Sequence, residues 1–173
     1  MVISDVIEYK GKIMSKLLSI PDIFTLINNK DISKPYEMIN KNIFSYMKVP
    51  NTTTLVKNYI CFDYNTKISA RNDSYKNVLI NVGIICHKDE INTMWGNRHD
   101  VISGVIVDVF NLSNFLGYQL ELVSDTESIM ENGYHARTLQ FRNLTLNSFE
   151  NGVKVNGVRW TTIVFWQWLY HQW

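Results

Sequence analysis

A change of hydrophobic period between residues 77 and 115 constrains the fold of this chain more than any other feature of its sequence. In KNVLINVGIICHK, five apolar residues share one face of an extended strand: Val78, Ile80, Val82, Ile84 and Cys86. From residue 98 to 115 the apolar residues instead recur at steps of three and four, which predicts a helix ended by Gly117. A strand with one apolar face followed by an amphipathic helix predicts a sheet with a helix packed on it.

The rest of the chain supplies the other elements of these two layers. We predict helices over residues 4–18 and in PDIFTLINN, where Pro21 suits the first turn. Residues 30–57 are a long connection with short elements. NYICFDYNTKISA forms a hairpin with the alternating strand, and YQLELVSD and YHARTLQFRNLTL are two further strands joined by TESIMENG. The predicted class is α+β: N-terminal helices, then a mostly antiparallel β-β-α-β-β sheet with one long helix on a face.

The 173 residues predict a single α+β domain, residues 1–150, followed by a Trp-rich C-terminal extension, residues 151–173. Most aromatic residues of the extension fall on even positions, including Trp166, Trp168 and Tyr170, and the chain ends on Trp173. A segment this apolar is expected to be covered rather than left in water. Two alternatives stay open: the extension packs on its own domain, or it docks on a partner through residue types that dominate binding hot spots.

Net charge, apolar runs and cysteine content limit the classes of function that fit this chain. The formal net charge is +1, which lacks the strong positive balance of a typical nucleic-acid binder. No run of about 18 apolar residues occurs, so no membrane span is predicted. Cys61 and Cys86 lie within strand-like runs and lack a CxxC spacing, so we expect buried free thiols.

The polar stretch from His87 to Asp100 is the first candidate for chemistry. A metal site here would draw on His87, Asp89, Glu90, His99 and Asp100. His99 and Asp100 are adjacent, so their side chains diverge by about 100° on a helix, and no HExxH spacing is present. We expect instead that Asn97 caps the helix and that the Asp100 carboxylate, at the third position, interacts favourably with the positive end of the helix dipole. The sequence therefore predicts neither a metal nor a cofactor.

Two other polar groupings contain residue types that are used in catalysis. A nuclease would combine Asp63, Glu121 and a lysine on neighbouring strands, but the residues that follow Glu121 lack that lysine. Arg137 and Arg142 lie on the last long strand, after Asp125 and Glu127. A solvated face, or salt bridges between subunits, explains these charges more simply than catalysis does. No catalytic residue is predicted.

The order of elements carries a resemblance to a known group. The stretches concerned are NYICFDYNTKISA, NVLINVGIICHKDE, WGNRHDVISGVIVDVFN and YQLELVSDTESIMENGYHARTLQF. A strand ending in charge, a loop, a long helix, a short strand and a longer strand follow one another. This order is similar to that of the tail terminator and tail completion proteins of long-tailed bacteriophages, which are head–tail joining proteins of the neck. The resemblance covers about residues 1 to 147, and the Trp-rich extension and the 30–57 connection depart from it.

The resemblance implies a structural virion protein of the neck or tail, assembled in the host bacterial cytoplasm. It implies a homohexameric ring that ends the tail tube, contacts the tail tube protein and a head-completion or connector protein, and lets DNA pass without sequence readout. No reaction, cofactor or membrane is implied. Exposed strand edges and the aromatic extension are candidates for the contact faces. The residues expected at such interfaces are His87, Asp89, Glu90, Trp95, Arg137, Trp166, Trp168, Tyr170 and Trp173.

Two alternatives to a ring-forming structural protein remain open. One is a metal-dependent hydrolase or nuclease that uses the region from His87 to Asp100. The other is a non-viral adaptor whose aromatic extension binds a second protein.

Overall fold

The computed structural model of the chain describes residues 3–48, 58–68, 75–130, 133–146, 149–150 and 153–154. The helices are α1 (Ile3–Leu18), α2 (Pro21–Ile27) and α3 (Arg98–Phe110), with two 3-10 turns, η1 (Pro35–Met38) and η2 (Lys88–Glu90). The main strands are β1 (Ile43–Phe44), β2 (Asn58–Ile68), β3 (Tyr75–His87), β6 (Glu121–Ile129) and β7 (Tyr134–Leu146). Two small hairpins join β4 (Asn92–Thr93) to β5 (Gly96–Asn97) and β8 (Phe149–Glu150) to β9 (Val153–Lys154).

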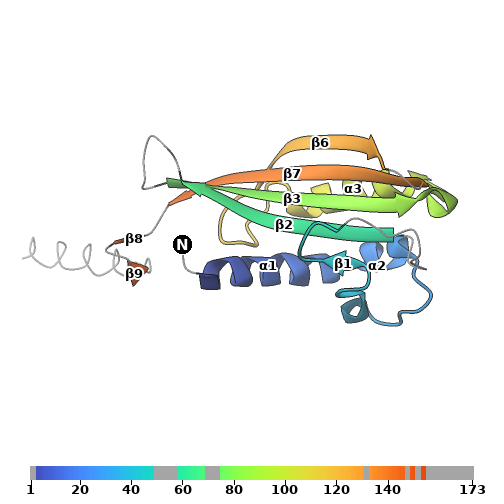
Figure 1. The fold of residues 1–173 in the computed structure, drawn as a ribbon, viewed down its shortest axis with the longest axis horizontal. Helices are drawn as coiled ribbons and strands as arrows, with labels where there is room; N and C mark the ends of the chain where they lie inside the picture. Colours follow the sequence, from blue (N-terminus) through green and yellow to red (C-terminus); the bar gives the residue numbers. More distant parts are fainter. Residues whose placement is uncertain are drawn as a thin grey trace, which may run out of the picture.

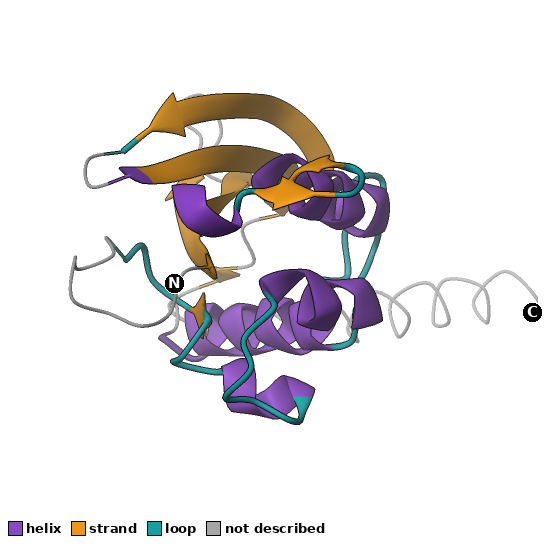
Figure 2. Cartoon of the chain, turned by 90° about the vertical axis from the view of Figure 1, so that its right-hand side faces the viewer, coloured by secondary structure: helices purple, strands orange, loops and turns teal. Residues whose placement is uncertain are grey.

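A five-stranded sheet in the order β1-β2-β3-β7-β6 forms one layer of the protein (Figure 1). β1 runs parallel to β2, and every other neighbouring pair of this sheet is antiparallel. The three helices form the second layer, which Figure 2 shows from the end of the sheet. The predicted α+β class is confirmed, and so is the hairpin of β2 and β3, in which Asn58 lies opposite Cys86.

The apolar core lies between the sheet and the helices. The predicted apolar face of β3 is confirmed, because five alternate side chains are fully buried in this core: Val78, Ile80, Val82, Ile84 and Cys86. Burying one aliphatic side chain contributes roughly 1.5–3 kcal/mol, so this stripe fixes which face of the sheet meets the helices. A smaller apolar cluster that includes Tyr59, Ile85 and Tyr134 covers one end of the opposite face. Both cysteines are buried and unlinked, as predicted.

The predicted end of the long helix was wrong. α3 ends at Phe110 rather than at residue 115. Leu112 adopts a left-handed conformation, with φ 57°, and its N–H donates to the carbonyl oxygen of Leu120 at 2.8 Å. This bond turns the chain toward β6. Phe115 and Leu116 keep the apolar period of the helix, but they pack on the core from a loop.

The predicted bounds of the strand after α3 were also wrong. β6 spans Glu121–Ile129, so four residues assigned to the connection, TESI, belong to the strand. These residues lack the alternation of a half-buried strand because β6 lies at the edge of the sheet and is mostly exposed. Their conformation is set by pairing with β7, in which Glu127 lies opposite Arg137. In contrast, β7 spans the predicted stretch YHARTLQFRNLTL.

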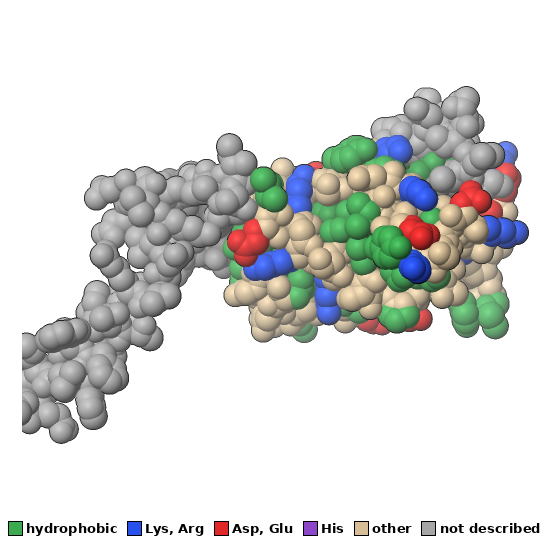
Figure 3. Space-filling view, turned by 90° about the horizontal axis from the view of Figure 1, so that it is seen from below, with side chains coloured by type: hydrophobic (Ala, Val, Ile, Leu, Met, Phe, Trp, Pro, Cys, Tyr) green, Lys and Arg blue, Asp and Glu red, His purple; other side chains and the backbone are tan. Residues whose placement is uncertain are grey.

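The surface carries charges of both signs. On the face nearest α1, lysine and arginine side chains are interspersed with acidic and apolar ones (Figure 3). Among the described residues, no helix combines the length and the apolarity needed to cross a membrane. The aromatic residues predicted to bind a partner, Trp166, Trp168, Tyr170 and Trp173, lie outside the described residues.

Candidate partner-binding site

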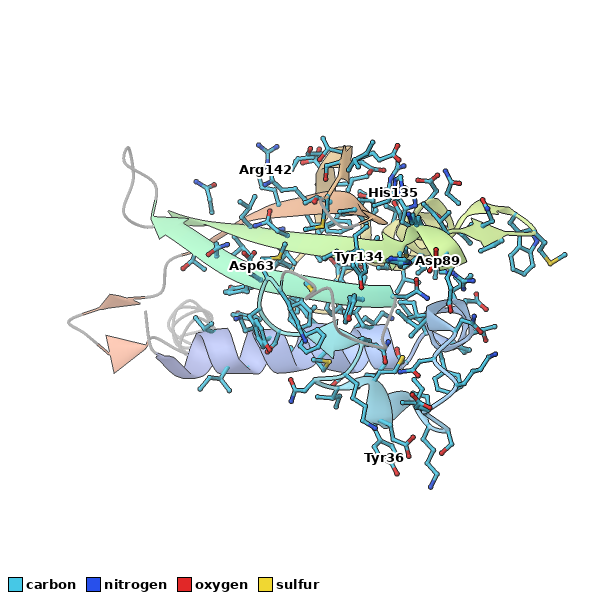
Figure 4. The ribbon with its side chains drawn as sticks, turned by 45° about the vertical axis from the view of Figure 1, so that its right-hand side comes forward. Tyr36, Asp63, Asp89, Tyr134, His135 and Arg142 are labelled. Atoms are coloured by element: carbon cyan, nitrogen blue, oxygen red, sulfur yellow. The ribbon has the colours of Figure 1, made fainter. Side chains whose placement is uncertain are left out.

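The polar stretch singled out in the sequence lies at one end of the sheet. β3 ends at His87, which pairs with Tyr134 at the start of β7. Asp89 and Tyr134 lie at this same end in Figure 4, and the yellow-green β4–β5 hairpin projects beyond it. We call residues 87–97, from the end of β3 to the start of α3, the β4–β5 loop. Its position at the rim of the sheet makes it accessible to another molecule.

Arg98 anchors this loop to the helical layer. Arg98 is 9% exposed, which is unusual for arginine, and its side chain donates to two backbone carbonyl groups. Nε donates to the carbonyl oxygen of Glu90 at 2.6 Å, and Nη1 donates to that of Leu26 at 2.5 Å. The backbone N–H of Arg98 donates to the carbonyl oxygen of Ile91 at 2.6 Å. One residue therefore joins the β4–β5 loop, α3 and the last turn of α2.

Glu90 adds a second anchor, because its carboxylate points back toward the domain. Oε2 accepts hydrogen bonds from Nδ2 of Asn58 at 3.2 Å and from Nδ2 of Asn28 at 3.3 Å. Asn58 is 2% exposed and also donates to the carbonyl oxygen of Ile27 at 2.9 Å. Glu90 was expected at a partner interface. The structure gives it a role in holding the loop to α2 and β2.

The tip of the loop presents two large apolar side chains to solvent. Met94 is 84% exposed and Trp95 is 68% exposed. The turn itself is ordered by Thr93, whose Oγ1 donates to the carbonyl oxygen of Gly96 at 2.7 Å and accepts from the N–H of Trp95 at 3.2 Å. Gly96 has φ 125°, a conformation that side-chain-bearing residues rarely adopt. The turn that carries the two exposed side chains is therefore held by its own hydrogen bonds.

A shallow groove of about 250 Å³ lies beside Trp95. It runs between α2 and α3 and is lined by Asp22, Thr25, Leu26, Trp95, Val101 and Val105. A larger hollow, of about 610 Å³, lies at the other end of the sheet and is lined partly by Glu121, Arg142 and Asn143. None of the predicted interface residues that the structure describes, His87, Asp89, Glu90, Trp95 and Arg137, lines the larger hollow. The groove beside Trp95 thus combines with the exposed tip to form one apolar surface.

His87 and Asp89 form the near side of the loop. His87 Nδ1 accepts a hydrogen bond from the N–H of Asp89 at 3.3 Å and lies 3.2 Å from Asp89 Oδ2. The His87 ring meets the Tyr134 ring edge-on, with centroids 4.9 Å apart. These contacts order the start of η2 against β7.

Arg137 is engaged by carboxylates of its own chain. Its Nε and Nη2 donate to the two oxygens of Asp125 at 2.7 and 3.1 Å, and Nη1 donates to Asp100 Oδ1 at 2.5 Å. The hydrogen bond with Asp125 raises the pKa of the Arg137 guanidinium above its ordinary value. His99 is fully buried beside this group, with Nε2 3.1 Å from Glu127 Oε1. The network ties the start of α3 to β6 and β7, and a role for Arg137 between subunits stays a prediction.

The predicted helix cap at Asn97 is correct in position only. Asn97 is the N-cap residue of α3, but its side chain accepts no hydrogen bond from the helix. Asp100 lies in the first turn as expected, where it also pairs with Arg137. Arg98, which follows Asn97 directly, holds the start of the helix through its side chain instead.

The residues considered for a metal site come together only in pairs: His87 Nδ1 lies 3.2 Å from Asp89 Oδ2, and His99 Nε2 lies 3.4 Å from Asp100 Oδ1, although these two neighbours were expected to diverge. Within the described ranges, no group of three or more His, Cys, Asp and Glu side chains is placed to hold a metal ion. His87 packs on Tyr134, whereas His99 is buried beside Glu127. Burial raises the pKa of the Cys61 thiol, and it raises that of Cys86 to about 12, which disfavours the thiolate that a nucleophile requires.

The two acids weighed for a nuclease lie on strands that do not adjoin. Asp63 is on β2, where its Oδ1 accepts from Nδ2 of Asn81 at 2.8 Å. Glu121 is on β6, where it pairs with Arg142 at 3.4 Å, and β3 and β7 lie between the two strands. The geometry offers this pair no shared metal or substrate position.

Sequence reasoning missed Arg98 and also Asn58, the partner of Glu90, which together join the β4–β5 loop to α2 and β2. An arginine directly after a helix cap and an asparagine at a strand start are ordinarily solvated, and neither pattern indicates burial. Asn58 and Arg98 became significant only when the fold brought α2 beside the β4–β5 loop.

Comparison with known proteins gives one family. The family model described as YomW matches residues 14–143, from within α1 to within β7. The match includes the β4–β5 loop and both of its anchors. No curated protein matches the chain.

Proposed function

Because the chain belongs to the YomW family, whose name is phage-derived, we propose that it is a structural protein of the virion head–tail interface. In this proposal it forms a homohexameric ring that ends the tail tube and joins it to the head connector. The order of elements supports the proposal, since it is similar to that of tail terminator proteins over most of the matched range.

The observation that most directly supports the proposal is the exposed tip of the β4–β5 loop. Trp95 and Met94 stand out from a base that Arg98 and Glu90 fix to the domain. Because hydrogen bonds already order the turn that carries Trp95, binding costs less backbone entropy, and tryptophan is enriched at the centres of protein interfaces. An exposed pair of this size beside an apolar groove is therefore suited to contact another protein.

A ring also requires each subunit to present two different surfaces. The tip and groove lie at the end of the sheet where β3 stops and β7 begins. In the proposed ring this surface meets a different surface of the next copy, which gives a heterologous contact that closes on itself. The tail tube protein and a head-completion or connector protein would then contact the two rims.

The near-neutral charge is consistent with passage of DNA through the lumen. With a formal net charge of +1, the subunit has little excess positive charge with which to retain phosphates. A channel that held DNA through many lysine or arginine contacts would bind it strongly at low salt. We therefore expect no sequence-specific binding of DNA, and localisation in the virion neck.

Deletion of the gene from a phage genome tests the proposal. The expected result is free heads together with tails of uncontrolled length, because nothing ends the growing tube. Supplying the wild-type chain in trans restores joined particles, whereas the Trp95→Ala chain does not. Normal virions without the protein would contradict the proposal.

A further inference from the structure

The outer edge of β6 is one edge of the main sheet. β6 is the last strand of the five-stranded sheet, and among the described residues only β7 pairs with it. A register shift between Leu122 and Ser124 interrupts its first part, but the run from Asp125 to Ile129 pairs regularly with β7. This run therefore offers outward N–H and C=O groups that a further strand can bind.

The side chains of β6 indicate what kind of strand would fit. Ile129 is 80% exposed and Val123 is 39% exposed, so apolar area on this edge is open to water. The strand also carries three acids, Glu121, Asp125 and Glu127, and no basic residue of its own. Each acid pairs with a side chain of another element, namely Arg142, Arg137 and His99 in turn. A second copy of β6 would set acid against acid, which disfavours direct pairing of two copies. The fitting occupant is β-prone, apolar and free of acidic residues.

One segment of this chain outside the described residues has this chemistry. Residues 158–166, VRWTTIVFW, are rich in β-branched and aromatic types and contain one arginine and no acid. No acidic residue occurs anywhere after Glu150. We propose that residues 158–166 dock along the Asp125–Ile129 edge of β6 as an additional strand.

The position of β7 makes this docking reachable. β7 is antiparallel to β6 and ends at Leu146, beyond Arg142, which lies opposite Glu121 at the start of β6. The chain therefore leaves the sheet beside the end at which β6 begins. To reach the outer edge of β6 it passes around that one strand, a lateral distance of two strand spacings, or about 10 Å. The segment of the same chain or that of a neighbouring copy meets the same chemistry, and the docking does not depend on the proposed ring.

Amide hydrogen exchange tests the docking. The full chain is compared with a chain that stops after Lys154, which keeps the β8–β9 hairpin. Loss of the segment is expected to speed exchange within residues 125–129 by about tenfold or more, because pairing protects edge amides. Unchanged exchange in β3, over residues 78–84, shows that the shortened chain is folded. Equal exchange of residues 125–129 in the two chains would overturn the proposal.

A substitution in the full chain gives a second test that removes no residues. Ile163→Asp places an acid against the acidic edge and is expected to speed exchange of residues 125–129, whereas the matched Ile163→Val chain keeps their protection. If Ile163→Asp leaves that protection intact, the proposal fails. Protection that rises with protein concentration assigns the segment to a neighbouring copy, and protection independent of concentration assigns it to the same chain. The docking holds in both cases, so its failure is distinguishable from failure of the ring.

Discussion

Arg98 donates a hydrogen bond from Nη1 to the carbonyl oxygen of Leu26, a residue 72 positions earlier in the chain. Leu26 lies in the last turn of α2, where carbonyl groups have no partner within the helix. The neighbouring carbonyl, of Ile27, accepts from Asn58 on β2. A helix as short as α2 is marginal alone, so these tertiary bonds hold it in place. They also hold the β4–β5 loop, which places Trp95.

Replacing Arg98 is predicted to weaken both the fold and the loop. Arg98→Met keeps much of the aliphatic volume but leaves the carbonyl oxygens of Leu26 and Glu90 without their donor. Each buried acceptor left unsatisfied costs about 1–3 kcal/mol, so we expect the free energy of unfolding to fall by about 2–4 kcal/mol. Chemical denaturation measures this. The matched control is Arg142→Met, at an exposed position of β7, where a loss comparable to that of Arg98→Met would contradict the account.

Asn58 and Glu90 are predicted to be energetically coupled. Asn58→Ala removes the donor to both Glu90 Oε2 and the Ile27 carbonyl oxygen, and Glu90→Ala removes the shared acceptor. Residues of one hydrogen-bond network show interaction energies of about 0.5–3 kcal/mol in double-mutant cycles. Denaturation of the two single variants and the double variant gives this energy. Strict additivity would show that the network does not hold the loop.

Much of the fold could be predicted from sequence, and the exceptions have identifiable causes. β7 and the inward face of β3 were predictable because periodicity and burial agree there. The end of α3 was not, because the left-handed Leu112 breaks the helix while the apolar period continues. The second half of β6 was not, because an exposed edge strand takes its conformation from its neighbour.

The site was predictable only at its exposed part. Trp95 could be singled out because a tryptophan in a polar loop is conspicuous in sequence. Arg98 and Asn58 could not, because their roles depend on α2, which is far away in the chain and adjacent in space.

Truncating Trp95 is predicted to affect assembly without affecting stability. The side chain is 68% exposed, so Trp95→Ala should change the free energy of unfolding by less than about 0.5 kcal/mol. In the proposed ring, self-association should fall sharply, because Trp95 is proposed to supply the central apolar contact. The control is Tyr36→Ala, at a residue that is 59% exposed and lies on the far side of α1 from the sheet (Figure 4). Light scattering measures the self-association of each variant, and chemical denaturation measures its free energy of unfolding. Equal loss of self-association in the two variants would contradict the proposed interface.

The Arg137 network is predicted to stabilise the join between α3 and the sheet. Arg137→Met leaves Asp100 and Asp125 close together without their shared cation. Because these groups are partly exposed, solvent screening limits the loss to about 1–2 kcal/mol. Adding Asp125→Asn to Arg137→Met should recover part of the loss by relieving repulsion between the two acids. A double variant less stable than Arg137→Met would show that repulsion is not the cause.

Alkaline pH is predicted to destabilise the fold through its buried thiols. Burial raises the pKa of Cys86 from 9.0 to about 12, and burial also raises that of Cys61. Above pH 9 the unfolded chain loses a proton that the folded chain retains, so the free energy of unfolding falls as pH rises toward 12. Below pH 9 this contribution is fully present. Denaturation from about pH 7 to about pH 10 should show a smaller decline for Cys86→Ala than for the parent chain.

The molar mass of the full chain in solution tests the ring most directly. Size-exclusion chromatography with light scattering is predicted to give a closed hexamer for the parent chain and mostly monomer for Trp95→Ala, with α2, α3 and the sheet intact in both. The same variant should fail to form rings in electron micrographs. A parent chain that stays strictly monomeric at all concentrations, and that is absent from purified virions, would contradict the account.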